Sequence, residues 1–271
     1  MNKIIAIGDI HGNPMQLSFR NNPDMRQYDE TDVAVFLGDW GLVFGHYNID
    51  EEKYNLGWLN NQKYKSVVVM GNHDDYDWAE ALPEVKAFGT TMKQAVLDGI
   101  VYENIYIIDT WCIADICGKH CLLIAKADSH DVWEDTFTDT GLNVLTYPKE
   151  KYLGRLYRAK NKFYRVLGKS WWPQEHMDID EFTLFLEKNN TVDQHFDCIF
   201  SHDCLSDFNT MGLNGQRRFK STPQEDLFGA MSRVFHYNIW LHGHMHCDIV
   251  YPLNEKVQCV YKYNVEIGGN E

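Results

Sequence analysis

The feature that most constrains the fold is a pattern that recurs along the chain. A short apolar run, suited to a strand buried on both faces, ends at a small residue that leads into Asp, Asn or His. The runs cover residues 3–7, 33–37, 66–70, 196–200 and 238–241. Open α/β sheets hold their ligands beyond the carboxyl ends of the strands. The pattern therefore predicts an α/β fold in which five strand ends meet at one crevice.

The stretches between these runs predict the remaining elements. Helical spacing is present at 15–26 and 51–63, and at 178–190 and 223–236, the last of these after Ser221 and Thr222 as caps. Residues 249–252 and 257–263 predict a hairpin. Residues 105–108 and 121–125 look like strands that extend a sheet through a turn at 118–119. We therefore expect one domain over 1–271, with an insert at approximately 110–175 that shapes the mouth of the crevice.

Composition excludes several classes of protein. The chain has 25 Lys and Arg against 39 Asp and Glu, a formal charge of −14, which disfavours nucleic-acid binding over the whole surface and suits bound divalent cations. Its apolar runs fall far short of the roughly 20 residues that span a bilayer, so we expect no membrane partner and a cytoplasmic location. Seven cysteines without a C-x-x-C pair indicate reduced thiols.

Metal-competent side chains follow all five runs. They stand as Gly8-Asp9-Ile10-His11, Gly38-Asp39, Gly71-Asn72-His73-Asp74, Ser201-His202 and Gly243-His244-Met245-His246. In this order they resemble the calcineurin-like metallophosphoesterase superfamily, whose signature is G-D-x-H, G-D, G-N-H-[DE], a lone His and G-H-x-H. The resemblance implies a two-sheet β-sandwich flanked by helices in four layers (αββα). Two divalent cations would have to lie about 3.5 to 4 Å apart in such a centre.

The resemblance also implies how the ligands divide between the two ions. One ion takes Asp9, His11 and His246, the other takes Asn72, His202 and His244, and Asp39 bridges both. Mixed nitrogen and oxygen ligands favour Mn, Fe, Zn or Ni. A bridging hydroxide would attack phosphorus, while His73 in its charged form protonates the leaving group or steadies the phosphoryl oxygen.

The expected activity is hydrolysis of a phosphomonoester or phosphodiester such as a nucleotide. Two alternatives stay open: a nucleic-acid-directed phosphodiesterase or nuclease, and a non-catalytic metal-binding scaffold of the same fold. The second motif, Gly38-Asp39-Trp40-Gly41, departs from the G-D-x-x-D-R-G of protein serine/threonine phosphatases and disfavours that branch. It also leaves open what orients His73, for which the candidates are Asp74, Asp75, Asp128 and Asp131.

Basic side chains provide the candidate substrate contacts. Residues 151–169 carry seven Lys or Arg and no acid, interleaved with aromatics, and form either a solvated helical face or an anion-binding flap. If nucleic acid is a partner, Lys160, Lys162 and Arg165 are the cations to neutralise. Arg217 and Arg218 follow the His202 motif, and Lys126 follows a predicted strand, so each is a candidate for phosphate contact or for a solvated loop.

Overall fold

The first sheet is built from the apolar runs of the N-terminal half. The computed structural model describes residues 2–208, 220–252 and 254–268. Strands β1 (Lys3–Ile7), β2 (Val33–Leu37), β3 (Lys65–Val69) and β6 (Ile100–Ile108) are parallel neighbours. Antiparallel strands β15 (Val265–Gly268), β5 (Thr90–Leu97) and β4 (Glu84–Ala87) complete the order β15-β1-β2-β3-β6-β5-β4. Nearly every residue of β1, β2 and β3 is buried, as expected of parallel strands covered on both faces.

The second sheet collects the C-terminal strands in the order β13-β14-β12-β11-β8-β7. Strands β8 (Lys119–Ile124), β11 (His195–Ser201), β12 (His236–His242) and β14 (Asn254–Cys259) are parallel. Strands β13 (Ile249–Tyr251) and β7 (Trp111–Ile116) pair antiparallel at the two edges. The antiparallel pairing of β13 with β14 confirms the predicted C-terminal hairpin, with a shorter turn.

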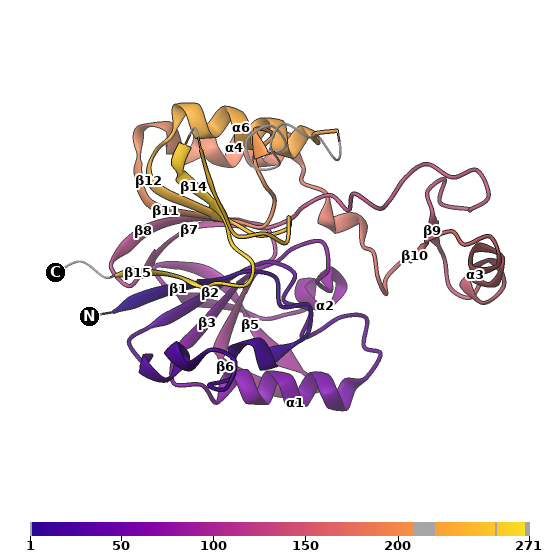
Figure 1. The fold of residues 1–271 in the computed structure, drawn as a ribbon, viewed down its shortest axis with the longest axis horizontal. Coiled ribbons are helices and arrows are strands. Elements are labelled where there is room, and N and C mark those ends of the chain that lie inside the picture. The colour runs from indigo at the N-terminus through magenta and orange to yellow at the C-terminus, as the bar shows by residue number, and fades with distance from the viewer. Residues whose placement is uncertain (1, 209–219, 253, 269–271) are drawn as a thin grey trace.

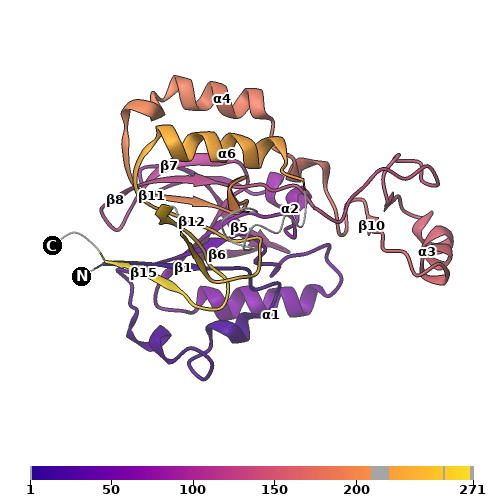
Figure 2. The same ribbon diagram turned by 45° about the horizontal axis from the view of Figure 1, so that its top comes forward.

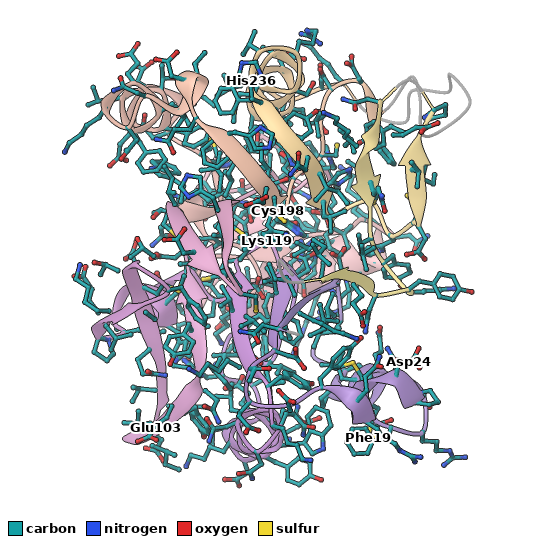
Figure 3. All side chains as sticks on the ribbon, turned by 90° about the vertical axis from the view of Figure 1, so that its left-hand side faces the viewer. Phe19, Asp24, Glu103, Lys119, Cys198 and His236 are labelled. Carbon is teal, nitrogen blue, oxygen red and sulfur yellow. The ribbon has the colours of Figure 1, made fainter. Side chains whose placement is uncertain are left out.

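Helices lie on the outer sides of the two sheets. Figures 1 and 2 show α1 (Ile49–Asn60) against the first sheet, and α4 (Ile179–Lys188) and α6 (Pro223–Val234) over the second. Helix α6 begins as predicted, because the Thr222 side chain accepts a hydrogen bond from Glu225 N at 3.1 Å and the Glu225 side chain accepts one from Thr222 N at 2.8 Å. Side chains fill the space between the sheets, where Cys198 lies (Figure 3). The mixed α/β class is thus confirmed.

Two predictions for the N-terminal half and the middle are wrong. Residues 15–26 form two 3-10 turns, η1 (Pro14–Leu17) and η2 (Pro23–Gln27), because Pro23 has no N–H to continue a helix and keeps Asn22 out of the helical region. The strands predicted at 105–108 and 121–125 lie in different sheets. Sequence reasoning missed β7, which turns back into β8 through Cys117 and Gly118, both with positive φ.

Part of the segment 110–175 projects from the body. Its first strands, β7 and β8, belong to the second sheet. Short parallel strands β9 (Val144–Leu145) and β10 (Arg165–Val166) and helix α3 (Glu150–Ala159) form a lobe on the side away from the termini (Figures 1 and 2). The short elements α2 (Tyr76–Glu80), η3 (Pro173–Glu175) and η4 (Thr191–Asp193) complete the described structure.

Two further expectations concern the whole chain. All seven cysteines lie in the described ranges, where each is a free thiol, as predicted, and five are buried. Among the described helices, none combines the length and apolar character needed to cross a bilayer.

Candidate metal centre

The structure brings together the side chains that follow five strands. Asp9 and His11 follow β1, Asp39 follows β2, and Asn72 follows β3, while the histidines come from the ends of β11 and β12. Two groups have ligand atoms within 4.8 Å of one another: Asp9, His11, Asp39 and His246, and Asp39, His202 and His244. Asp39 belongs to both groups. This is the division of ligands that the sequence analysis assigns to two ions, with Asp39 between them.

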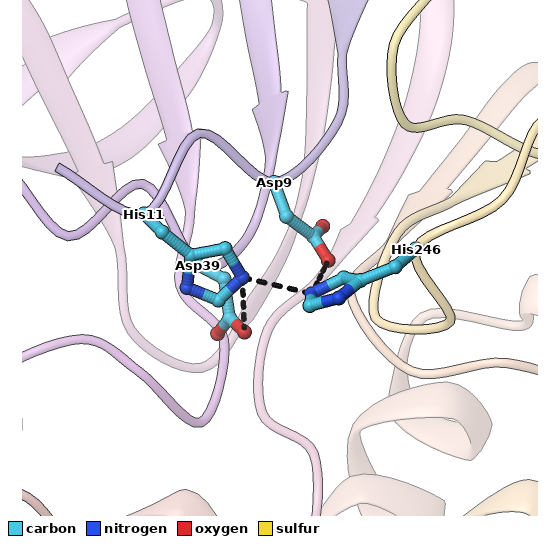
Figure 4. A group of neighbouring side chains, drawn as sticks. All are labelled: Asp9, His11, Asp39 and His246. Carbon is cyan, nitrogen blue, oxygen red and sulfur yellow. Dashed lines mark hydrogen bonds and ion pairs between the residues drawn. The ribbon is translucent and has the colours of Figure 1, made fainter. Parts of the chain in front are cut away.

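The first group converges through its ring nitrogens and carboxylate oxygens (Figure 4). His11 Nε2 lies 2.8 Å from His246 Nε2. His246 Nε2 lies 3.2 Å from Asp9 Oδ2, and His11 Nε2 lies 3.8 Å from Asp39 Oδ2. Four atoms that can donate lone pairs therefore face one small volume, which is the arrangement that a divalent cation requires.

The second group surrounds His202, which is fully buried. His202 Nδ1 lies 2.7 Å from the Leu37 carbonyl oxygen, to which it donates a proton. His202 Nε2 then faces two acceptors, Asn72 Oδ1 at 3.0 Å and Asp39 Oδ1 at 3.2 Å. Burial lowers the pKa of His202, but the Asp39 and Asp9 carboxylates outweigh it and raise that pKa to about 10. A positive charge is therefore favoured among these acceptors, and a cation can take the place of the proton.

Two further observations fit a cation at the second group. His244 Nε2 is buried and makes no hydrogen bond with any described residue. The Asn72 amide nitrogen donates to Ser129 Oγ at 3.1 Å, which fixes the amide oxygen toward His202. A buried ring nitrogen without a partner and an oriented amide oxygen are the ligand atoms that such a site needs.

The glycines of the motifs are required by close packing of the ligands. A Cβ on Gly38 would collide with the His202 ring, and one on Gly71 would collide with Asp39 and His202. A Cβ on Gly243 would collide with Asp9 Oδ1. Gly38, Gly71 and Gly243 therefore make room for candidate ligands that come from other strands.

The backbone is strained at four of the ligands. His11, Asp39, His244 and His246 have φ of 44°, 47°, 67° and 49°. A residue with a Cβ in this left-handed region costs about 1 to 2 kcal/mol. Such strain gathers at functional sites because the surrounding contacts hold it in place.

His73 lies beside both groups. Its backbone N–H donates to Asp39 Oδ1 at 2.7 Å, and its ring lies 5.2 Å from the His11 ring, centroid to centroid. Burial lowers the pKa of His73 to about 4, although Asp39 opposes this. The ring is therefore neutral at pH 7 without a bound anion, whereas the sequence analysis expects its charged form.

Sequence reasoning missed the contact between His73 and Arg165. Arg165 Nη2 lies 3.0 Å from His73 Nε2, and its Nε and Nη2 donate to Asp131 at 2.7 to 3.3 Å. Of the four aspartates considered for orienting His73, Asp131 is the one that reaches it, through this arginine. The sequence feature that could have indicated this contact is the basic segment 151–169, which contains Arg165 and no acidic residue.

The other three aspartates hold the surrounding loops. Asp74 accepts hydrogen bonds from Gly71 N and Gly41 N at 2.7 and 3.0 Å. Asp75 caps α2 by accepting from Trp78 N at 2.9 Å. Asp128 pairs with the His176 ring at 2.5 Å.

The remaining candidate substrate contacts have different outcomes. The Lys126 ammonium group lies 3.4 Å from the His176 carbonyl oxygen and 5.9 Å from the centre of the Tyr76 ring. His176 follows η3 and Tyr76 lies in α2, so neither contact is with a candidate metal ligand. Arg217 and Arg218 lie outside the described residues.

The basic segment divides between solvent and site. Lys160 and Lys162 are exposed and lie over the Phe137 ring, 4.9 and 5.7 Å from its centroid. Arg165 is buried, with 7% of its surface exposed, and points toward His73. The lobe thus presents cations and aromatics to solvent and one buried arginine to His73.

A buried hydrogen-bond chain anchors the lobe beside the site. Glu175 is fully buried, and its Oε1 accepts from Ser129 N at 2.9 Å and Trp171 Nε1 at 3.0 Å. Ser129 in turn contacts Asn72. Burial raises the pKa of Glu175 to about 8. The support of Asn72 and the anchor of the lobe are therefore one network.

Comparison with known proteins adds little. No protein-family model matches this chain, and no curated protein matches it. Among solved structures, a protein of unknown function from Aquifex aeolicus matches with 15% sequence identity, a TM-score of 0.28, and coverage of 75% of this chain and 81% of that chain. A similarity at this level supports no inference about fold family or function.

Proposed function

We propose that this chain is a metal-dependent phosphoester hydrolase of the calcineurin-like metallophosphoesterase type. The observation that carries the proposal is the position of Asp39, whose carboxylate belongs to two ligand groups built from four strand ends. The two sheets with helices on their outer sides fit the four-layer arrangement of that superfamily. When bound, two divalent cations such as Mn, Fe, Zn or Ni would activate water and neutralise phosphoryl charge.

The residues of the chain divide the remaining work. Asp9, His11 and His246 would hold one cation, Asn72, His202 and His244 the other, and Asp39 both. The seven ligands carry only two carboxylates, so an occupied centre keeps a net positive charge that attracts phosphate. His73 lies next to both groups, where its ring N–H can donate to a phosphoryl or leaving oxygen. The charge of a phosphate beside the ring would raise the pKa of His73 and favour the proton-donating form.

Metal content and ester hydrolysis test this proposal. Purified protein should contain close to two transition-metal ions per chain and hydrolyse nitrophenyl phosphate, bis-nitrophenyl phosphate or both. His73→Ala should keep the metal and lose about a hundredfold or more in kcat. Metal without turnover on a broad phosphoester panel would favour the non-catalytic scaffold, and protein that binds no added Mn or Zn would refute the proposal.

A further inference from the structure

Arg165 is held as a fixed group at the base of the lobe. It begins β10, and its backbone N–H donates to the Asn143 carbonyl at 3.0 Å. The Asp131 carboxylate accepts hydrogen bonds from Arg165 Nε and Nη2, and Arg165 Nη1 donates to the Ser170 carbonyl at 3.2 Å. With 7% of its surface exposed, this guanidinium is held in one orientation at the crevice.

The contact between Arg165 and His73 leaves donors without acceptors. Arg165 Nη2 and Nη1 lie 3.0 and 3.4 Å from His73 Nε2 and Nδ1. A neutral imidazole accepts at only one of its nitrogens, and a guanidinium has no acceptor. At least one of the two contacts is therefore not a hydrogen bond. An anionic oxygen that lies beside the pair, within reach of both, is a group that both side chains could bind.

The surroundings of this pair limit what the anion can carry. The Phe44 ring lies 6.0 Å from the His73 ring, and the buried Trp172 ring lies 5.4 Å from Phe44. The surroundings of His73 thus include packed aromatic groups. They suit a bare phosphate oxygen better than an oxygen that carries a second organic substituent.

We propose that Arg165, positioned by Asp131, binds a terminal oxygen of the substrate phosphate, and that the substrate class is phosphomonoesters. The proposal rests on the function proposed above and specifies its substrate. A monoester presents one more unesterified oxygen and about one more negative charge than a diester. A planar, permanently charged guanidinium binds such an oxygen pair through parallel hydrogen bonds, which an ammonium group cannot match.

The test compares two esters in matched variants. Arg165→Ala should lower kcat/KM for nitrophenyl phosphate by about a hundredfold, and for bis-nitrophenyl phosphate by a much smaller factor. Arg165→Lys should recover only part of the loss. Arg158→Ala, at an exposed arginine of α3, is the control and should leave both rates unchanged. Metal content and the thermal unfolding midpoint of each variant identify any that has lost its fold or its ions.

Binding of inorganic phosphate, measured by calorimetry, gives a readout that needs no turnover. Its Kd should rise at least tenfold in Arg165→Ala at unchanged metal content. Equal losses on both esters in Arg165→Ala, a wild-type preference for the diester, or unchanged phosphate affinity would each overturn the inference. A wild type that binds neither metal nor ester refutes the hydrolase itself. In that case the phosphate titration still decides whether Arg165 binds an anion.

Discussion

Replacing Asp39 by Asn is the most direct test of a shared ligand. Asp39 is buried, and its two oxygens face different groups, Oδ1 toward His202 at 3.2 Å and Oδ2 toward His11 at 3.8 Å. The His73 N–H donates to Oδ1, so the asparagine oxygen should take that place and its NH2 should face His11. The variant therefore removes one negative charge that both ion sites share. It also removes one ligand atom from the site that contains His11.

The size of the effect follows from the charge. A unit charge about 4 Å from another contributes about 4 kcal/mol at an effective dielectric constant of about 20, which is roughly a thousandfold in a dissociation constant and a lower bound for an ion of charge +2. We expect Asp39→Asn to weaken both ions by at least that factor, the ion nearer His11 more strongly. Mn or Zn titration followed by calorimetry measures both sites.

A control with the same change of charge is Glu103→Gln. Glu103 is exposed near the start of β6 (Figure 3), whereas the candidate ligands follow the ends of the strands parallel to it. The affinity of the Glu103→Gln variant for metal should equal that of the wild type. If Asp39→Asn keeps two ions at wild-type affinity, the assignment of Asp39 as a shared ligand is incorrect. If it weakens one ion alone, Asp39 is a ligand but not a bridge.

Three other predictions test the packing, the buried acid and the lobe. Gly71→Ala should abolish metal binding, because its Cβ would collide with two ligand side chains. Gly57→Ala in α1 has open space around the new Cβ and should raise the free energy of unfolding by up to about 1 kcal/mol. Equal effects of the two substitutions on metal binding and on the free energy of unfolding would contradict this reasoning. Burial raises the pKa of Glu175 from 4.5 to about 8, so its contribution to stability is complete below about pH 4.5 and is lost as the pH rises toward 8. Glu175→Gln should remove this part of the pH dependence in chemical denaturation, and parallel curves for variant and wild type would disprove it. If the lobe binds nucleic acid, Lys160→Ala combined with Lys162→Ala should flatten the salt dependence of oligonucleotide affinity, and no wild-type binding at low salt would end that idea.

The amino-acid sequence by itself determined the strands that carry the site. Strands β1 and β2 have the predicted bounds, and the runs before Asn72, His202 and His244 are also strands. The burial of a whole apolar run and the identity of the residue that follows it are both local properties. Parallel strands in one sheet place such ends at a common edge, so local patterns group the ends of β1, β2 and β3 and, separately, those of β11 and β12. The packing of one sheet on the other then decided that these two edges meet.

Tertiary packing alone decided the partners of those side chains. The contact between Arg165 and His73 joins residues 92 positions apart, and nothing in the spacing of the basic segment distinguishes Arg165 from the exposed Lys160 and Lys162. For the same reason, the sequence could not predict which groups the Lys126 side chain contacts or that β8 belongs to the second sheet. A side chain's partner depends on how separate segments dock, and docking is set by the summed contacts of the whole chain rather than by any local pattern.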